Sequence, residues 1–147
     1  MIAHNMRELE QMLLREMVKA MNVTSEKVLA NMYEETGKFY TSGKPVMYQR
    51  TGALGDTPKT TSLSVNGKSA SFEAYLDQSG GYSTGKSPSM HDVLNLTNYH
   101  ITSSSVGYLK PALGKAGFWE RAEKKMEKSL NQTMRKFFRW KEVLIYG

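Results

Sequence analysis

Cysteine is absent from the sequence and histidine is scarce. The three histidines, His4, His91 and His100, lie far apart, and no two of them are spaced as neighbours on one face of a helix. The absence of cysteine excludes disulfides, thiol nucleophiles and zinc sites built on cysteine. The scattered histidines do not form a metal-binding pattern either. We therefore expect no metal ion and no other cofactor.

Long apolar runs are also missing. No segment approaches the roughly 18 consecutive apolar residues that a membrane-spanning helix needs. The first twelve residues contain Arg7, Glu8 and Glu10 and have no apolar stretch, so they do not resemble a signal peptide. With 39% hydrophobic and 23% charged residues, the chain of 147 residues has the composition of one globular domain. We expect it to fold in the cytoplasm and not to bind a membrane.

Positive charge is concentrated in one segment. Between Lys115 and Lys141 there are nine Lys and Arg and three Glu, and this difference equals the net charge of +6. Such a segment is typical of a nucleic-acid-binding surface or of a site for an acidic protein. It is more often the solvated face of an amphipathic helix. The candidate nucleic-acid contacts are Arg121, Lys124, Lys125, Lys128, Arg135 and Lys136.

Apolar residues at intervals of three and four predict helices near both ends of the chain. Asn5 is a suitable N-cap, and Glu8 stands at the capping-box position. Asn22–Thr24 indicates a break, after which Thr24 or Ser25 caps a second helix, although one long kinked helix fits equally well. The helix over 118–138 carries its apolar stripe at Trp119, Ala122, Met126, Leu130, Met134 and Phe137.

A β-hairpin is predicted in the middle of the chain. Residues 60–65 alternate, Asn66-Gly67 is a strong turn signal, and residues 69–77 form the second strand. On that strand, alternation places Ala70, Phe72, Ala74 and Leu76 on one face and Ser71, Glu73 and Tyr75 on the other.

Together these elements predict an α+β fold in a single domain, 1–147. Its parts are N-terminal helices (about 5–40), a sheet based on an antiparallel β-hairpin (about 60–77), a flexible loop (about 78–90), one long C-terminal helix (about 118–138) and a closing strand within 140–146. Residues 98–109 are weakly strand-like.

No motif predicts an enzyme. Residues 80–87 match the pattern G-x-x-x-x-G-K-[ST], but the preceding strand alternates, whereas a phosphate-binding loop follows a buried parallel strand. Pro88 comes next and no helix of useful length follows, so we interpret this segment as a flexible loop. Glu34 and Glu35 are interpreted as part of an amphipathic helix rather than as catalytic acids.

The segment from Tyr48 to Leu54, Tyr-Gln-Arg-Thr-Gly-Ala-Leu, joins the helical region to the hairpin as a loop leading into a strand. This segment, the hairpin and a final helix that opens Gly117-Phe118-Trp119-Glu120 resemble the minor tail-component, or head–tail joining, family of long-tailed double-stranded DNA phages. The motif of that family is similar to Pro-Val-x-Thr-Gly-x-Leu. Here Pro-Val lies several residues upstream, at 45–46. Gly52 is expected at positive φ in a tight turn.

The resemblance implies a structural virion protein of the neck or upper tail that assembles in the host cytoplasm. It would complete the tail as a ring of about six copies and contact the head connector or stopper proteins and the tail tube, close to phage DNA. The alternative is a small basic nucleic-acid-binding protein that uses the C-terminal helix. The residues assigned to the fold or to interfaces are Tyr48, Arg50, Thr51, Gly52, Leu54, Tyr82 and Lys86.

Overall fold

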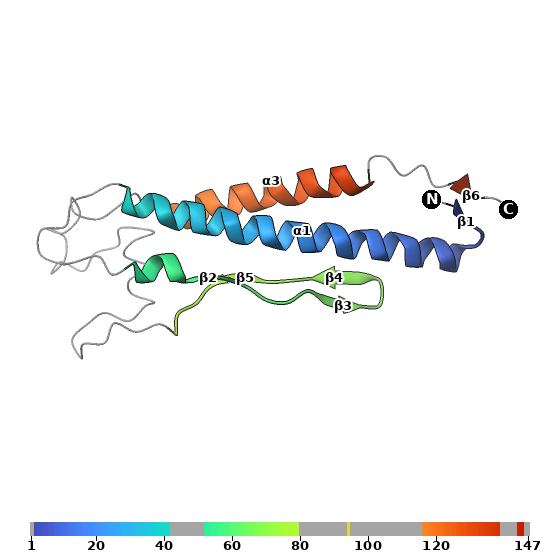
Figure 1. The fold of residues 1–147 in the computed structure, drawn as a ribbon, viewed down its shortest axis with the longest axis horizontal. Coiled ribbons are helices and arrows are strands. Elements are labelled where there is room, and N and C mark those ends of the chain that lie inside the picture. Colours follow the sequence, from blue (N-terminus) through green and yellow to red (C-terminus); the bar gives the residue numbers. More distant parts are fainter. Residues whose placement is uncertain (1, 42–51, 80–93, 95–115, 139–143, 146–147) are drawn as a thin grey trace, which may run out of the picture.

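The computed structural model describes residues 2–41, 52–79, 94, 116–138 and 144–145. Figure 1 shows the long helix α1 (Met6–Tyr40) in the centre, with the helix α3 (Phe118–Phe138) along one side and a narrow β-ribbon along another. The ribbon consists of β2 (Pro58–Thr60), β3 (Ser64–Asn66), β4 (Ser69–Ser71) and β5 (Ala74–Leu76). This arrangement confirms the predicted α+β class. None of the described helices is long and apolar enough to cross a membrane.

α1 is one continuous helix of 35 residues, so the predicted break at 22–24 is wrong and the alternative of one long helix is correct. The buried Thr24 hydroxyl donates to the carbonyl of Ala20 at 2.8 Å instead of capping a new helix. A threonine can satisfy its hydroxyl inside a helix in this way. The predicted N-cap is confirmed, because Asn5 Oδ1 accepts a hydrogen bond from Glu8 N at 2.9 Å.

α3 runs antiparallel to α1 and has the predicted bounds. Asn31 Nδ2 donates to Ser129 Oγ at 2.8 Å, and Lys27 Nζ donates to Thr133 Oγ1 at 3.4 Å. Continuing this register places Phe138 beside about residue 22 of α1. Residues 6–21 of α1 therefore extend past α3 by about 24 Å, at a rise of about 1.5 Å per residue. We call this segment the overhang.

The ribbon is the predicted hairpin, with two corrections. Asn66 pairs with Ser69, so Gly67 and Lys68 form the turn, one residue later than predicted, with Gly67 at φ 57°. The two antiparallel ladders are separated by residues 61–63 on one strand and only 72–73 on the other, which is a β-bulge. The predicted faces of the second strand are confirmed: its apolar residues are half-buried, and Ser71, Glu73 and Tyr75 are exposed.

The short segment before the ribbon is the 3-10 helix η1 (Ala53–Asp56) rather than a strand. Gly52 has φ 83°, as predicted for a tight turn, and its carbonyl accepts from Gly55 N at 2.8 Å. Leu54 is buried in a core cluster with Phe39, Leu94 and Phe118. A second cluster joins Val28, Met32 and Ala122 to half-buried ribbon residues. Both clusters lie against the C-terminal half of α1.

The predicted closing strand exists as β6 (Leu144–Ile145), but its partner was not foreseen. It pairs in parallel with β1 (Ile2–Ala3), a strand at the other end of the chain. Figure 1 places this pair at the N-terminal end of α1, beyond the ribbon tip. β6 therefore does not extend the hairpin.

Candidate functional site

A buried carboxylate lies between α1 and α3. The side chain of Glu35 is only 1% exposed, and three cations surround it. Glu35 Oε2 accepts from Arg121 Nε at 2.7 Å, while Oε1 lies 2.6 Å from Lys38 Nζ and 2.7 Å from Lys125 Nζ. A buried charge is tolerated only when it is paired and hydrogen-bonded in this way. Glu35 thus fixes the position of α3 on α1.

The ionised state of Glu35 is strongly favoured. Burial alone would raise the pKa of this carboxyl, but hydrogen bonds from Lys125, Lys38 and Arg121 outweigh it and lower the pKa to about 2. The same contacts raise the pKa of Lys38. A carboxylate with so low a pKa is a poor general base near neutral pH. The chemistry of the cluster is therefore that of a structural ion-pair network between α1 and α3.

Arg121 also ties the start of α3 to the chain before it. Its Nη1 donates to the carbonyl of Ala116, and its Nη2 is buried with no hydrogen-bond partner among the described residues. Gly117 has φ 74°, and a Cβ at this position would come within 3.4 Å of Arg121 Nη1. Glycine therefore provides both the backbone conformation and the space for the guanidinium.

The outer edge of the cluster is more exposed. Glu34 lies 2.6 Å from Lys125 Nζ and 3.0 Å from Lys38 Nζ, but its side chain is 53% exposed. Hydrogen bonds from Lys125 and Lys38 lower the pKa of Glu34. Because solvent screens exposed pairs, these contacts are worth less than the buried ones.

The six candidate nucleic-acid contacts fall into two sets. Arg121 and Lys125 are bound to Glu35. The others are exposed, and the structure gives them no ion pair with any residue that it describes. These exposed cations are Lys124, Lys128, Arg135 and Lys136.

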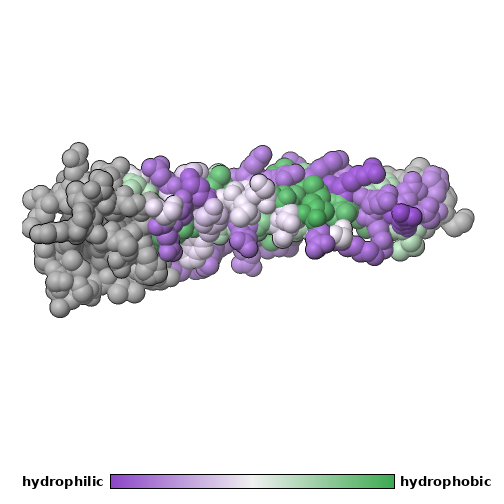
Figure 2. Space-filling view, turned by 90° about the horizontal axis from the view of Figure 1, so that it is seen from below, coloured by the Kyte–Doolittle hydropathy of each residue, from purple (hydrophilic) through white to green (hydrophobic). Residues whose placement is uncertain are grey.

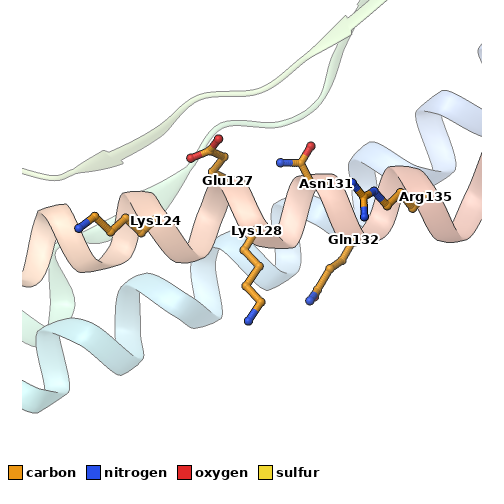
Figure 3. A pocket seen from close by; sticks show the side chains of 6 residues that line it. All are labelled: Lys124, Glu127, Lys128, Asn131, Gln132 and Arg135. Atoms are coloured by element: carbon orange, nitrogen blue, oxygen red, sulfur yellow. The ribbon is translucent and has the colours of Figure 1, made fainter.

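Three of the exposed cations border a shallow groove on α3. Figure 3 shows Lys128 and Gln132 extending to one side of the helix and Glu127 and Asn131 to the other. All the lining residues come from this one helix, so the groove is a space between surface side chains and not an enclosed cavity. Lys124 and Arg135 complete the lining.

The overhang carries a different kind of surface. The residues of α1 that face α3 include Glu35, Asn31 and Lys27, and steps of three and four continue this line to Thr24, Ala20, Met17 and Leu13, with Met6 two turns further on. Ala20 and Thr24 are buried, whereas Leu13 is 37% exposed and Met6 is 63% exposed. The line that contacts α3 thus continues as an apolar stripe that the described residues of α3 do not cover and that is exposed at Leu13 and Met6.

Of the residues assigned to the fold or to interfaces, the structure describes Gly52 and Leu54, which form the turn and the core contact given above. Tyr48, Arg50, Thr51, Tyr82 and Lys86 lie outside the described residues, as do the phosphate-loop-like segment 80–87 and the weakly strand-like segment 98–109. Within the described part of the chain, no group of His, Asp and Glu side chains could hold a metal ion.

Sequence reasoning missed the role of Glu35, which was interpreted only as part of an amphipathic helix. A signal was present, because Glu35 stands three residues after Met32 and four before Phe39, and both of these are buried. That spacing is the spacing of the apolar stripe itself. A charged residue at a core position predicts a partner of opposite charge on another element.

Comparison with known proteins gives one match. A family model described as YomN matches residues 5–139, whereas no curated protein and no solved structure matches the chain. The matched region begins at the N-cap of α1 and ends just after α3. It includes the ribbon and the Glu35 cluster, and it leaves out β1 and β6.

Proposed function

The chain belongs to the YomN family, a phage-derived family from a Bacillus phage region, and we propose that it is a structural protein of the phage neck or upper tail. In this role it completes the tail as a closed ring of about six copies. Its partners are further copies of itself, the head connector or stopper proteins and the tail tube. It assembles in the host cytoplasm, becomes part of the virion, and is not an enzyme.

The observation that carries the proposal is the apolar stripe of the overhang. On the C-terminal half of α1 the same helix face is polar and is covered by α3 of the same chain, and past Phe138 it continues as an apolar stripe through Met17, Leu13 and Met6. A helix face that is apolar beyond its intramolecular partner is suited to a partner in another molecule. Continuity with the α1–α3 contact favours a second copy of the chain as that partner.

The ribbon supports the same proposal. Each sheet in the described part of the chain has only two strands, and the ribbon is stabilised by packing one of its faces against α1. Figure 2, which views the molecule from the ribbon side, shows an apolar area within a mostly hydrophilic face. The exposed large side chains of the ribbon include Val65 and Tyr75. Two different surfaces on one subunit, ribbon and overhang, are what a head-to-tail ring contact needs.

The test is the assembly state of the full-length protein by native mass spectrometry and electron microscopy. We expect closed rings from the wild type, and Leu13→Lys should dissociate them because it places a charge in the apolar stripe. The matched control is Gln11→Lys, which adds the same charge at an exposed position on another face of α1. Circular dichroism reports whether each variant is folded.

Two results would contradict the proposal. One is a wild type that remains monomeric at the highest attainable concentration and also with the tail tube protein added. The other is a Leu13→Lys variant that assembles as the wild type does, which would remove the overhang from the interface.

A further inference from the structure

The exposed cations of α3 form a separate surface that the assembly contacts do not use. Glu34 and Glu35, which lie at the α1–α3 contact, are already engaged by Lys38, Arg121 and Lys125. They therefore do not neutralise the remaining cations of α3. Within the part of the chain that the structure describes, no ion pair engages Lys124, Lys128, Arg135 or Lys136, so their positive charge is open to a partner.

The geometry of these cations is regular. At about 100° per residue, Lys124, Lys128 and Arg135 fall within about 40° of one another around the helix axis. Along the axis, Lys128 lies about 6 Å from Lys124, and Arg135 lies about 10 Å further on. All three residues are exposed, and one carboxylate, Glu127, is among the side chains that line the groove (Figure 3).

We propose that the line of Lys124, Lys128 and Arg135 binds the phosphate backbone of nucleic acid without reading its sequence. Cations spaced along one helix suit a repeating polyanion, and Arg135 can contact a phosphate through two parallel N–H donors. The amides of Asn131 and Gln132, in the same groove, add neutral donors of the kind that contact phosphate oxygens.

The chemistry of the groove also limits what the surface recognises. No aromatic side chain lines it, so bases have no stacking platform there. The half-buried Met126 of α3 packs instead against the core cluster of Val28, Met32 and Ala122. Because this side of α3 faces the core, it is not free to enter a lipid surface as the apolar face of an amphipathic helix does. The contacts of the cationic line are electrostatic, and they do not depend on ring formation.

The test is fluorescence anisotropy of labelled double-stranded DNA of arbitrary sequence, titrated with the full-length protein over a series of salt concentrations. For three phosphate contacts, the logarithm of the binding constant should fall with the logarithm of salt concentration with a slope of about −3 per bound subunit. The triple variant Lys124→Gln/Lys128→Gln/Arg135→Gln should bind at least about tenfold more weakly and lose most of that slope.

The matched control is Lys19→Gln/Lys59→Gln/Lys68→Gln, which removes the same number of charges elsewhere and should retain binding. Equal weakening in the control and the α3 variant would overturn the proposal, because net charge alone would then explain binding. Wild-type binding to a poly-glutamate peptide but not to DNA would also overturn it, in favour of an acidic protein partner. Leu13 lies outside this surface, so the Leu13→Lys variant should still bind DNA. Failure of ring assembly and failure of DNA binding can therefore be told apart.

Discussion

The two halves of α1 differ in what covers the same helix face. In the C-terminal half, the face that meets α3 contains Asn31 and Glu35, and each has a matched partner on α3. In the overhang the same face is apolar and has exposed side chains, Leu13 and Met6. A polar contact that depends on exact matching specifies one partner in one register. An apolar stripe stabilises any helix of suitable shape. The intramolecular contact is therefore the specific one, and the overhang is the surface that we propose for assembly.

Removing the charge of Glu35 should have the largest effect. Glu35→Gln leaves Arg121 without the carboxylate that it binds, and breaking a buried ion pair typically lowers the free energy of unfolding by about 3–5 kcal/mol. Chemical denaturation measures this loss. Glu34→Gln is the control, since its carboxylate is 53% exposed and should contribute no more than about 1 kcal/mol.

A double variant sharpens that result. If the loss comes from an unpaired buried guanidinium, Glu35→Gln combined with Arg121→Gln should recover part of it. If the loss of unfolding free energy in the double variant instead equals the sum of the losses in the two single variants, the two residues are not coupled. Glu35 would then act through its lysine partners alone.

The Glu35 cluster should also make stability depend on pH. The pKa of Glu35 falls from an ordinary 4.5 to about 2 on folding, so the unfolded chain binds this proton more readily. The contribution is complete above about pH 4.5 and disappears as the pH falls from 4.5 towards 2; it amounts to about 3 kcal/mol. Urea denaturation at a series of pH values measures this decrease. In Glu35→Gln the decrease in the free energy of unfolding should be smaller by that amount. An identical decrease in the variant and the wild type would contradict the assignment of this pH dependence to Glu35.

Local patterns predicted the local structure well. The 3.6-residue period gave the bounds of α3, alternation gave the faces of β4 and β5, and Asn5 gave the start of α1. Each of these features depends on residues close together in the sequence. Gly52 also has the positive φ that was predicted, because a tight turn is a short-range requirement.

Most of the features that the sequence did not predict involve partners that are distant in the chain. Glu35 and Arg121 are separated by 86 positions, so nothing near Glu35 in the sequence shows that it is buried with a cation. The pairing of β1 with β6 joins the two ends of the chain. The Thr24 error has a different origin: threonine caps helices and also bonds to its own helix backbone, and local sequence does not distinguish the two.

The smallest expected effect lies in the overhang, and it tests how independent that segment is. Asn5→Ala removes the side-chain acceptor for Glu8 N and should lower the free energy of unfolding by about 1 kcal/mol. Hydrogen exchange locates the change: amides of the first turns of α1 should exchange faster, while those around Glu35 should not change, because α3 and its ion pairs hold that half. The control Asn22→Ala changes an exposed asparagine that is not a cap. Faster exchange throughout α1 in Asn5→Ala would show that the two halves open together, and the overhang could then not be treated as a separate assembly surface.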